Sequence, residues 1–561
     1  MNLHTTSYKG RKYLSIVRGY RDPETGKVRH KVVEKLGYLD DLEKQYPDPK
    51  AHFRRAAAEM TRLEREQSAP AAISLDKAER LGPGEPNRRN LGYAALSAIY
   101  HELRLDKFLS NRARSLKVDY SVNAIMKLLV YSRALRPASK KRTYERRGEY
   151  FEKFDFSLDD VYHCLTFASS LCGDLQRHLH KEVQKRYGRR AETVYYDVTN
   201  YYFEIDRPDD LRRKGVSKDH SPNPIVQMGL FIDEEGIPIS YGLFPGNAND
   251  CTTLLPMLDE AREEYGMGRA VIVADKGMCA SPNIAGCALG GYGYVFSQTV
   301  RGGRRELKEW VLDEGGYRWK GEDYKAKSRL RTREATAKGA DGKERKIQIE
   351  ERQVAFYSRD YDRKAKADRA AAVQKAREMV LDPAKYSRAT SHGAARYVKS
   401  LERGKKLAFD EERLAEEEKY DGYYLIATSE TNKTDEEVIE MYRGLWRIEE
   451  SFRVTKSDLE ARPVYLSRQD RINAHFLVCF VALLIARLLQ KRLGGGFSIA
   501  SIAESLSRAS CSKLEENWYV LDHCDEVVLA LKEKMGIDLT RKYMQLGDVK
   551  GMLAATKKGA L

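Results

Sequence analysis

The sequence predicts an α/β fold: a mixed sheet flanked by helices, interrupted by a β-rich insertion, with a mainly helical N-terminal region and a helical C-terminal region. Three observations predict it. Apolar residues recur at helical spacing from about residue 90 to 188, and strand-like runs begin at about residue 192. A turn-rich stretch dense in Lys and Arg, 298–420, then separates two groups of strand-like runs.

The composition favours a DNA-binding or RNA-binding protein with several domains. The chain has 561 residues, 42% of them apolar, so it can bury sizeable cores. Its net charge is +16, which favours a polyanionic partner such as nucleic acid. A basic surface with no assigned partner is the alternative that charge alone leaves open.

The cysteines and the apolar runs give no sign of secretion, zinc binding or a membrane. None of the eight cysteines forms a CxxC pair, so we expect them to pack as small apolar residues in a reducing cytoplasm. The first residues, MNLHTTSYKGRKY, contain no apolar signal region. The longest apolar run, 476–486, is too short to span a bilayer and predicts a buried core helix.

The first 189 residues divide into a short β-rich part and a helical part. Residues 1–50 alternate in strand-like fashion around a turn at Asp22-Pro23. Helical periodicity covers most of 51–189. Within it, the strongly basic stretch SRALRPASKKRTYERR, 132–147, either lies along a phosphate backbone or forms a solvated loop.

From residue 190 the pattern is β-β-β-α-β. The predicted elements, in order, are strands at 192–203, 225–232 and 237–244, a helix at 253–265 and a strand at 270–274. Asp197 lies in the first strand and Asp275 ends the fourth. Because both follow apolar strand runs, we expect their side chains at one edge of a single sheet. Alone, each aspartate would be read as a strand-end cap or a turn residue.

The sheet resumes after the basic insertion. We expect 298–420 to be mainly β with one charged helix, and 422–428 to be the fifth strand. Thr434 then opens a helix, with Glu437 completing a capping box, and this helix carries Glu449. Residues 491–561 are predicted to be helical. The alternative for the Glu449 helix is an amphipathic surface helix with i,i+4 charge pairs.

One face of that helix combines an acid, bases and aromatic rings. The residues at three- and four-residue spacing are Tyr442, Leu445, Trp446, Glu449, Phe452, Arg453 and Lys456. We expect the aromatic members to pack the helix on the sheet and Glu449 to project toward the strand ends. Lys456, two turns further, would hold a phosphate.

Three carboxylates in such a setting can bind a pair of divalent ions for phosphodiester chemistry. Hard oxygen ligands suit Mg²⁺ or Mn²⁺. Two such ions would activate an attacking oxygen and stabilise the leaving 3′-oxygen. The chain has no GxxxxGK[ST] loop, so ATP is not implied.

These segments resemble the DDE transposases of bacterial insertion sequences, in particular the insertion-sequence-four-like group, whose catalytic domain is RNase H-like. The resemblance covers about 190–490, including YYDVTNYYFE, VADKG and YRGLWRIEESFRVTK. The last segment resembles the group's Y-x2-R-x3-E-x6-K signature, which Tyr442, Glu449 and Lys456 fit by position. The chain departs at the Arg position, which is Leu445, and Arg443 and Arg447 have a different helical phase.

The resemblance implies a site and partners. Asp197, Asp275 and Glu449 would be catalytic and hold two Mg²⁺ or Mn²⁺ ions. The candidate DNA contacts are Tyr442, Arg447, Arg453, Lys456, Lys214 and Lys218. For the last two, in the loop RRKGVSKDH, a solvated hairpin loop is the alternative. The partner would be double-stranded DNA, both terminal inverted repeats and target, bound by a homodimer on paired ends, with no membrane involved.

The same resemblance gives each region a role. Residues 51–189 would bind and pair the DNA ends, and the insertion would help to hold them. The expected regions are 1–50, 51–189, the catalytic core at 190–297 and 421–490, the insertion at 298–420, and 491–561. The predicted function is DNA cleavage at the element's ends and strand transfer, in the bacterial cytoplasm. The alternatives are an RNase H-like nuclease without strand transfer and a non-catalytic DNA-binding protein.

Overall fold

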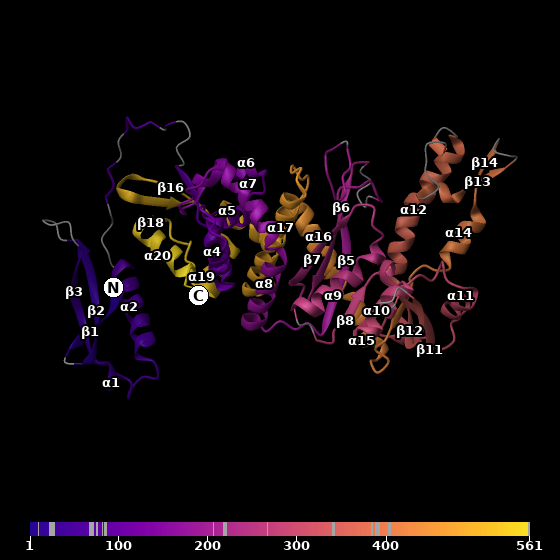
Figure 1. Cartoon of the computed structure of the whole chain (residues 1–561), viewed down its shortest axis with the longest axis horizontal. Coiled ribbons are helices and arrows are strands. Elements are labelled where there is room, and N and C mark those ends of the chain that lie inside the picture. The colour runs from indigo at the N-terminus through magenta and orange to yellow at the C-terminus, as the bar shows by residue number, and fades with distance from the viewer. Residues whose placement is uncertain are drawn as a thin grey trace. The chain divides into compact units, whose positions relative to one another are not determined.

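The chain forms two compact units, Met1–Arg80 and Leu81–Leu561, in a computed structural model (Figure 1). Each unit is described by itself. The structure describes residues 1–8, 10–21, 28–66, 72–74, 77–80, 82, 87–205, 207–216, 222–265, 268–338, 343–382, 385–386, 393–401 and 406–558.

The N-terminal unit is a three-stranded antiparallel sheet packed against a helix. Its strands are β1 (Asn2–Tyr8), β2 (Arg11–Arg21) and β3 (Val28–Tyr38), and its helices are α1 (Leu39–Leu42) and α2 (Pro49–Glu66). Leu14, Leu39 and Leu42 form a small core on which Phe53 of α2 packs. The unit therefore continues past residue 50, where the sequence predicted a boundary.

A nine-stranded mixed sheet dominates the larger unit. In sheet order its strands are β10 (Arg318–Lys320), β11 (Tyr324–Lys338), β12 (Glu344–Ser358), β15 (Tyr423–Thr428), β9 (Gly293–Gln298), β8 (Val271–Ala274), β5 (Thr193–Tyr202), β6 (Ile225–Ile232) and β7 (Pro238–Pro245). Among the described strands of this sheet, the parallel pairs are β8 with β5 and β8 with β9. The predicted mixed α/β fold is confirmed at this level.

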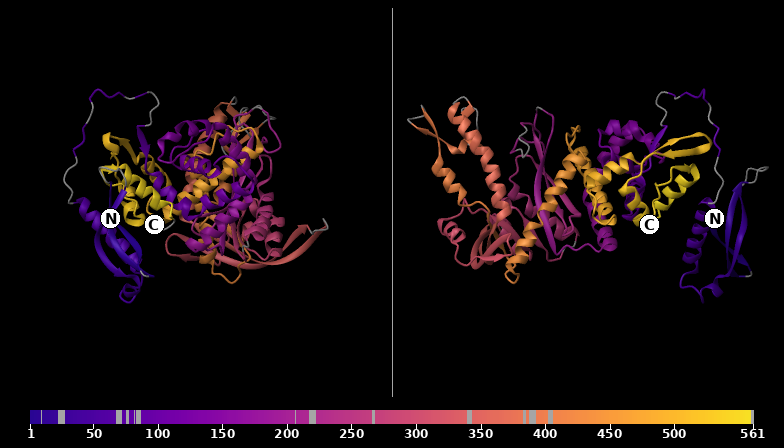
Figure 2. Two further views of the ribbon diagram at one scale, coloured as in Figure 1. Left: turned by 60° about the vertical axis from the view of Figure 1, so that its left-hand side comes forward. Right: turned by 180° about the vertical axis from the view of Figure 1, so that it is seen from behind.

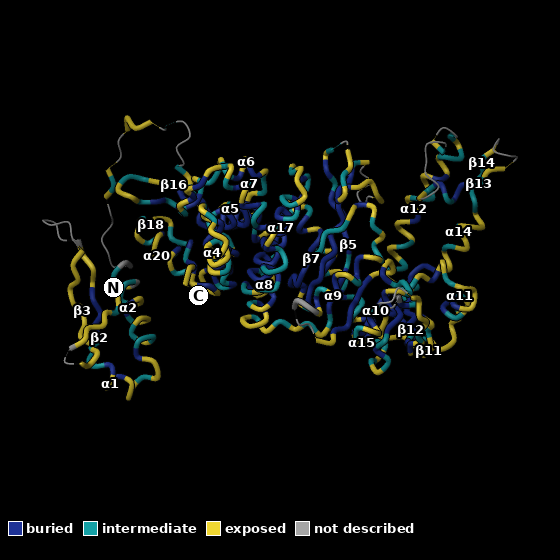
Figure 3. Tube along the Cα trace, in the orientation of Figure 1, coloured by how far each residue is buried: buried dark blue, intermediate teal, exposed yellow. Residues whose placement is uncertain are grey.

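Helices cover both faces of the sheet. On one face lie α9 (Leu254–Tyr265) and α10 (Ser281–Leu289). On the other lie α15 (Asp435–Arg443) and α16 (Trp446–Arg453). The strands between them are buried, as the dark blue traces of β5 and β7 show (Figure 3).

The four predicted strands from 192 to 274 correspond to β5, β6, β7 and β8. The predicted strand at 422–428 is present, but it is not the fifth strand of the sheet, because β9 comes before it in the chain. No strand was predicted at GYVFSQ, a run of only six residues that follows Gly290 and Gly291. The predicted strand is β15, which pairs antiparallel with β9.

The insertion has about as many residues in helices as in strands, which corrects the prediction that it is mainly β, and its long strands belong to the main sheet. β12 pairs with β15, and the distal parts of β11 and β12 extend away from the rest of the larger unit (Figure 2). The other elements of the insertion are α11 (Arg305–Leu312), α12 (Arg359–Leu381), β13 (Val398–Leu401), β14 (Lys406–Phe409) and α14 (Glu411–Glu418).

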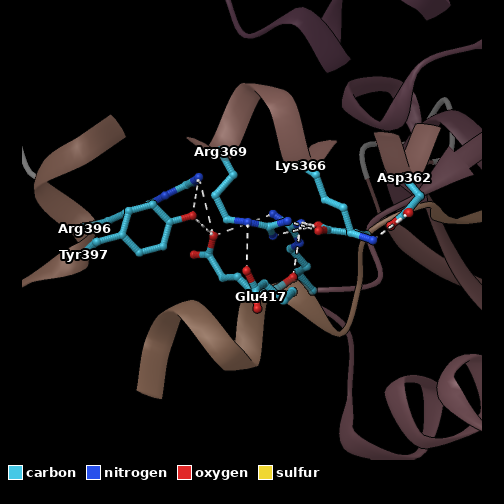
Figure 4. A network of polar contacts seen from close by, with 9 residues as sticks. Asp362, Lys366, Arg369, Arg396, Tyr397 and Glu417 are labelled. Atoms are coloured by element: carbon cyan, nitrogen blue, oxygen red, sulfur yellow. Dashed lines mark hydrogen bonds and ion pairs between the residues drawn. The ribbon is translucent and has the colours of Figure 1, made fainter. Parts of the chain in front are cut away.

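A polar network joins α12 and α14 to the start of β15 (Figure 4). The Arg369 guanidinium donates to both carboxylate oxygens of the buried Asp421, with Nη1 2.8 Å from Oδ1. Tyr397 donates a hydrogen bond of 2.7 Å to Glu417 of α14. Because Asp421 is buried, this bidentate pairing compensates for the loss of its hydration.

A helical bundle forms the rest of the larger unit. It contains α3 (Tyr93–Glu102), α4 (Leu105–Ser115), α5 (Val122–Leu135), α6 (Lys140–Glu145), α7 (Leu158–Ser170), α8 (Cys172–Tyr187), α17 (Gln469–Arg492), α18 (Ile499–Arg508), α19 (Glu526–Met535) and α20 (Leu546–Thr556). By length and composition α17 could span a membrane, but 94% of its most apolar window is buried inside the protein. It packs against α3, α5 and α7 as the predicted core helix.

The C-terminal region is not purely helical, which corrects the prediction. β16 (Ser510–Lys513), β17 (Trp518–Leu521) and β18 (Tyr543–Gln545) form a sheet with β4 (Arg88–Asn90). These strands have only three or four residues. Such short runs are too brief to display a strand period in the sequence.

Candidate active site

Asp197 and Asp275 lie next to each other on neighbouring strands. The parallel pairing of β5 with β8 ends with Tyr196 opposite Ala274. The next residue on each strand is the aspartate. Since adjacent strands are about 4.8 Å apart, the two carboxylates are immediate neighbours at one edge of the parallel pair. This register is the observation that brings together the two acids that the sequence predicted at one edge of the sheet.

Strand alternation sets the face on which both acids lie. Tyr196, Ala274 and Phe296 pack on the side of α9 and α10. Tyr195 and Val273 pack on the side of α15 and α16. Because side chains alternate between faces, Asp197 and Asp275 share the face of Tyr195 and Val273. The acids therefore lie on the side of the sheet that α16 covers, and α16 packs on β5 (Figure 1).

Short hydrogen bonds fix both aspartates. Ser297 Oγ of β9 donates to Asp275 Oδ1 over 3.2 Å, and the Lys276 amide donates to the same oxygen over 2.5 Å. The Val198 amide donates to Asp197 Oδ1 over 2.7 Å. Asp275 is exposed and Asp197 half-buried. The exposed carboxylate of Asp275 is thus accessible to a ligand while its orientation is held.

One tyrosine, Tyr424, interacts electrostatically with both Asp275 and Glu449. Burial raises the pKa of Tyr424, and the neighbouring Tyr361, Asp275 and Glu449 raise it further. Burial also raises the pKa of Tyr442, although a hydrogen bond with Ser297 lowers it and Asp275 raises it. Tyr424 therefore lies near both Asp275 and Glu449. Glu449 is exposed, on the first turn of α16.

The donor set suits hard divalent cations, but the three acids are not gathered into a finished metal site. Among the described residues, no group of three His, Cys, Asp or Glu side chains is placed to hold a metal ion. Asp197 and Asp275 offer adjacent carboxylate oxygens, which Mg²⁺ and Mn²⁺ prefer. The joint coordination by all three acids stays a prediction.

The predicted helix is interrupted just before Glu449. The capping box of Thr434 and Glu437 is present as predicted, but α15 ends at Arg443 and α16 begins at Trp446. A Cβ on Gly444 would lie 2.0 Å from the Tyr195 hydroxyl oxygen. Glycine at this position therefore allows the chain to pass close to the sheet beside the acids.

The expected packing of the aromatic residues is correct only in part. Tyr442 and Phe452 pack toward the sheet side. Trp446 is 55% exposed, so the prediction that it packs on the sheet was wrong. The break at Gly444 explains this, because a seven-residue face drawn on one straight helix does not continue across two helices.

The predicted DNA contacts lie in different surroundings. The Lys456 ammonium is 5.7 Å from the ring centre of Tyr201, on the same face of β5 as Asp197. The Arg447 guanidinium lies 6.0 Å from the ring centre of Tyr195. Arg453 is half exposed and pairs with Asp458 over 3.6 Å.

The loop between β5 and β6 is described only in part. Lys214 is exposed. Lys218 lies outside the described residues, so its predicted contact stays a prediction. No finding distinguishes a DNA contact at Lys214 from a solvated loop.

Sequence reasoning missed Ser297 and Tyr424. Ser297 lies in the overlooked strand β9. It is two residues after Val295, so the two side chains share a face, and this would have placed Ser297 on the acidic face. Tyr424 lies in the correctly predicted strand β15, but only its three-dimensional position relates it to Glu449.

Comparison with known proteins identifies the class of this chain. A family model described as "IS1634 family transposase, N-terminal domain" matches residues 3–72, and one described as "Transposase DDE domain" matches residues 223–485. The chain belongs to the DDE transposases of insertion sequences, as its sequence predicted. Asp275 and Glu449 lie within the second match. Asp197 lies before it, and the β5–β8 register is what joins it to Asp275.

A solved structure and the curated proteins add little to this assignment. The chain is similar to the structure titled "Cryo-EM structure of piggyBac transposase synaptic complex with hairpin DNA (SNHP)", with 9% identity and a TM-score of 0.36. The alignment covers 74% of this chain and 79% of that one. At this TM-score the similarity carries no argument about the site. No curated protein matches the chain.

Proposed function

We propose that Asp197, Asp275 and Glu449 form the catalytic centre of this transposase, within an RNase H-like arrangement. Strand order supports the arrangement: β5, β6 and β7 form an antiparallel meander, and β8 and β9 continue the sheet in parallel on the other side of β5. The observation that carries the proposal is the pairing of β5 with β8, which sets the first two acids side by side below α16.

The DDE domain implies dependence on a divalent metal, and we propose two Mg²⁺ or Mn²⁺ ions. Bound there, such ions would activate the attacking oxygen and stabilise the leaving 3′-oxygen. Asp197 and Asp275 would hold them from the sheet and Glu449 from α16. Ser297 orients Asp275 through its hydrogen bond. ATP has no role in this scheme, because each bond broken is matched by one formed.

The basic side chains beside the acids would position the DNA. Lys456 lies over Tyr201 on the acidic face, and Arg447 lies near Tyr195. Together with Tyr442, Arg453, Lys214 and Lys218, they would contact the phosphate backbone next to the scissile bond. The substrates would be the terminal inverted repeats of the element and a target DNA. A homodimer would hold the paired ends, in the cytoplasm where the chromosome lies.

Cleavage and joining of DNA ends test this proposal directly. Purified protein is incubated with Mg²⁺, duplexes carrying the element's ends and a target plasmid, and the products are mapped on sequencing gels. Asp275→Asn should abolish both cleavage and strand transfer. The matched control is Asp210→Asn, because Asp210 has a side chain 98% exposed. Its activity should equal that of the unaltered protein.

Two outcomes would change the assignment. Cleavage without any joined product would favour the nuclease alternative. Full activity of the Asp275→Asn protein would remove Asp275 from the catalytic centre.

A further inference from the structure

A cationic pocket lies in the helical bundle. Part of its lining comes from the basic stretch 132–147, for which the sequence allowed either a phosphate contact or a solvated loop. Its volume is about 160 Å³. Arg133 of α5, Lys140 and Lys141 of α6, and Arg462 line it, together with His475 of α17. The stretch is therefore not a solvated loop at Lys140, which is only 6% exposed.

The Lys140 ammonium is buried without a carboxylate partner. Its Nζ lies 3.0 Å from His475 Nδ1, and His475 Nε2 lies 2.9 Å from the Ala461 carbonyl oxygen. The second contact requires a proton on Nε2, so Nδ1 accepts from Lys140. In the described part of the chain, no Asp or Glu lies at ion-pair distance from Lys140. One imidazole nitrogen thus satisfies one of its three donors.

Arg133 adds a second buried positive charge. Its Nη1 donates to the carbonyl oxygens of Leu459 and Glu460 over 3.1 and 3.0 Å, and its Nη2 donates to that of Ala138 over 3.1 Å. Its Nε is buried without a partner. No carboxylate of the described residues pairs with it either. Two cations thus stand together at the floor of an open pocket.

Such an arrangement is costly unless an anion completes it. A buried charge without a counter-charge loses its hydration, and a few hydrogen bonds to neutral groups replace only part of it. Lys141 is exposed and Arg462 half-buried, and they add positive charge at the pocket. Glu460 is the acidic residue among those that line the pocket. A phosphate group, whose negatively charged oxygens can accept from several donors at once, is the ligand that this charge distribution favours.

The pocket lies close to the proposed catalytic strand. It is built partly from the segment that follows Lys456 in the chain, residues 460–466. The Arg462 guanidinium lies 5.5 Å from the ring centre of Tyr202, the last residue of β5. Since β5 carries Asp197, DNA whose scissile bond lay at the acids could place another phosphate at the pocket.

We propose that this pocket binds a backbone phosphate of the DNA substrate, with Lys140 and Arg133 at its floor and Lys141 and Arg462 beside them. The proposal rests on the DNA-processing function proposed above. It assigns the contact to a phosphate, so it adds affinity without reading the base sequence.

The first test uses the pH dependence of folding stability that follows from the burial of Lys140. Burial, and then Arg133, lower the pKa of Lys140 to about 7. Between pH 7 and 10.5 the unfolded chain then holds more protons at this residue than the folded protein, so stability rises with pH. The groups around it are Arg133, His475, Cys479, Tyr162, Glu460, Lys141 and Arg462.

Lys140→Met should remove this rise and should leave the phosphate-free protein at least as stable as the unaltered protein at pH 6. Thermal midpoints measured from pH 6 to 10 check both expectations. A variant markedly less stable at pH 6 would show a structural lysine and would overturn the proposal.

The second test measures phosphate and DNA separately. Inorganic phosphate should raise the thermal midpoint of the unaltered protein above that in chloride of equal ionic strength, and Lys140→Met should abolish this rise. For duplex DNA with the element's ends, the negative slope of log affinity against log salt should become shallower by about 0.9 in the variant. Lys141→Gln, at an exposed position, should weaken both responses and serves if Lys140→Met folds poorly.

Lys127→Met is the matched control. Lys127 is also buried, at 7% exposure, and burial lowers its pKa, but Glu152 raises that pKa and Lys127 is not part of the pocket. Its phosphate response and salt slope should be unchanged.

The remaining outcomes decide between the ligand sources. A phosphate response with an unaltered DNA slope in Lys140→Met would assign the pocket to free phosphate and overturn the proposal. An unchanged response in both assays would overturn it as well. Asp275→Asn should bind DNA with the normal slope, so a failure of the catalytic assignment is distinguishable from a failure of this one.

Discussion

The same strands of the central sheet carry an apolar layer on one face and the acidic side chains on the other. On the face of α9 and α10, Tyr196, Ala274 and Phe296 are fully buried and form an apolar layer. On the face of α15 and α16, the residues next to them are Asp197, Asp275 and Ser297. One step along β5 or β8 thus leads from the apolar layer to a carboxylate, and one step along β9 leads to the hydroxyl that holds Asp275.

This difference shows how a reactive site can be held rigidly. The buried layer fixes the strands, because its side chains are packed at interior density. The backbone that carries the acids is therefore fixed as well, although the side chain of Asp275 is exposed. Substitutions on the two faces should therefore separate stability from activity.

The largest effect is expected on the acidic face. Asp197→Asn should reduce DNA cleavage by roughly a thousandfold or more, because it removes several kcal/mol of stabilisation of the reacting groups. Its thermal midpoint should stay close to that of the unaltered protein. Timed cleavage assays and thermal melts check this, with Glu192→Gln, just before β5, as the control. Cleavage within tenfold of normal would contradict the assigned role.

On the opposite face the effect should move to stability. Phe296→Ala should cost about 3–5 kcal/mol of folding free energy, because it leaves a cavity in the buried layer. Cleavage per folded molecule should remain near normal. Denaturation curves and active-fraction titration measure the two quantities. Leu289→Ala, at a position 66% exposed on α10, should change stability by less than about 0.5 kcal/mol.

The close approach of the chain to the acidic face of the sheet can be tested at Gly444. Gly444→Ala should lower activity and destabilise the protein by about 1–3 kcal/mol, because the added methyl group meets the Tyr195 hydroxyl oxygen. Combining it with Tyr195→Leu should restore part of the loss, since the hydroxyl oxygen and the ring carbon Cζ, 2.0 and 2.4 Å from the added methyl group, are then both removed. No rescue in the double variant would mean that the contact does not explain the break between α15 and α16.

The smallest effect concerns the orientation of Asp275. Ser297→Ala should weaken the site by about 1 kcal/mol, or roughly fivefold in cleavage rate at limiting Mg²⁺. Ser297→Thr keeps the hydroxyl and should retain most activity. Cleavage measured across a Mg²⁺ titration checks this. Equal titrations for the alanine variant and the unaltered protein would assign Ser297 to packing alone.

The sequence was informative where a period was long and uniform. The apolar runs of β5, β6, β7 and β8 and the capping box at Thr434 were enough to locate four strands and the start of the Glu449 helix. The two aspartates followed from their places on those strands. These features depend on local sequence, so they can be read without knowledge of the fold.

What escaped prediction depends on distant parts of the chain. β9 is short and follows two glycines, so only its pairing with β8 and β15 defines it. The break at Gly444 arises from Tyr195, about 250 residues earlier. The burial of Lys140 arises from α17 and the segment around Glu460. None of these contacts leaves a period or a motif in the sequence.

The continuity of the sheet through the insertion has a mechanical consequence. Because β12 is hydrogen-bonded to β15, and β15 to β9, one strand separates the hairpin of β11 and β12 from the strand that holds Ser297. A load on the hairpin reaches that strand through backbone hydrogen bonds. Excising β11 and β12 completely would also remove the outer neighbour of β15 and leave that strand as an unpaired edge open to association.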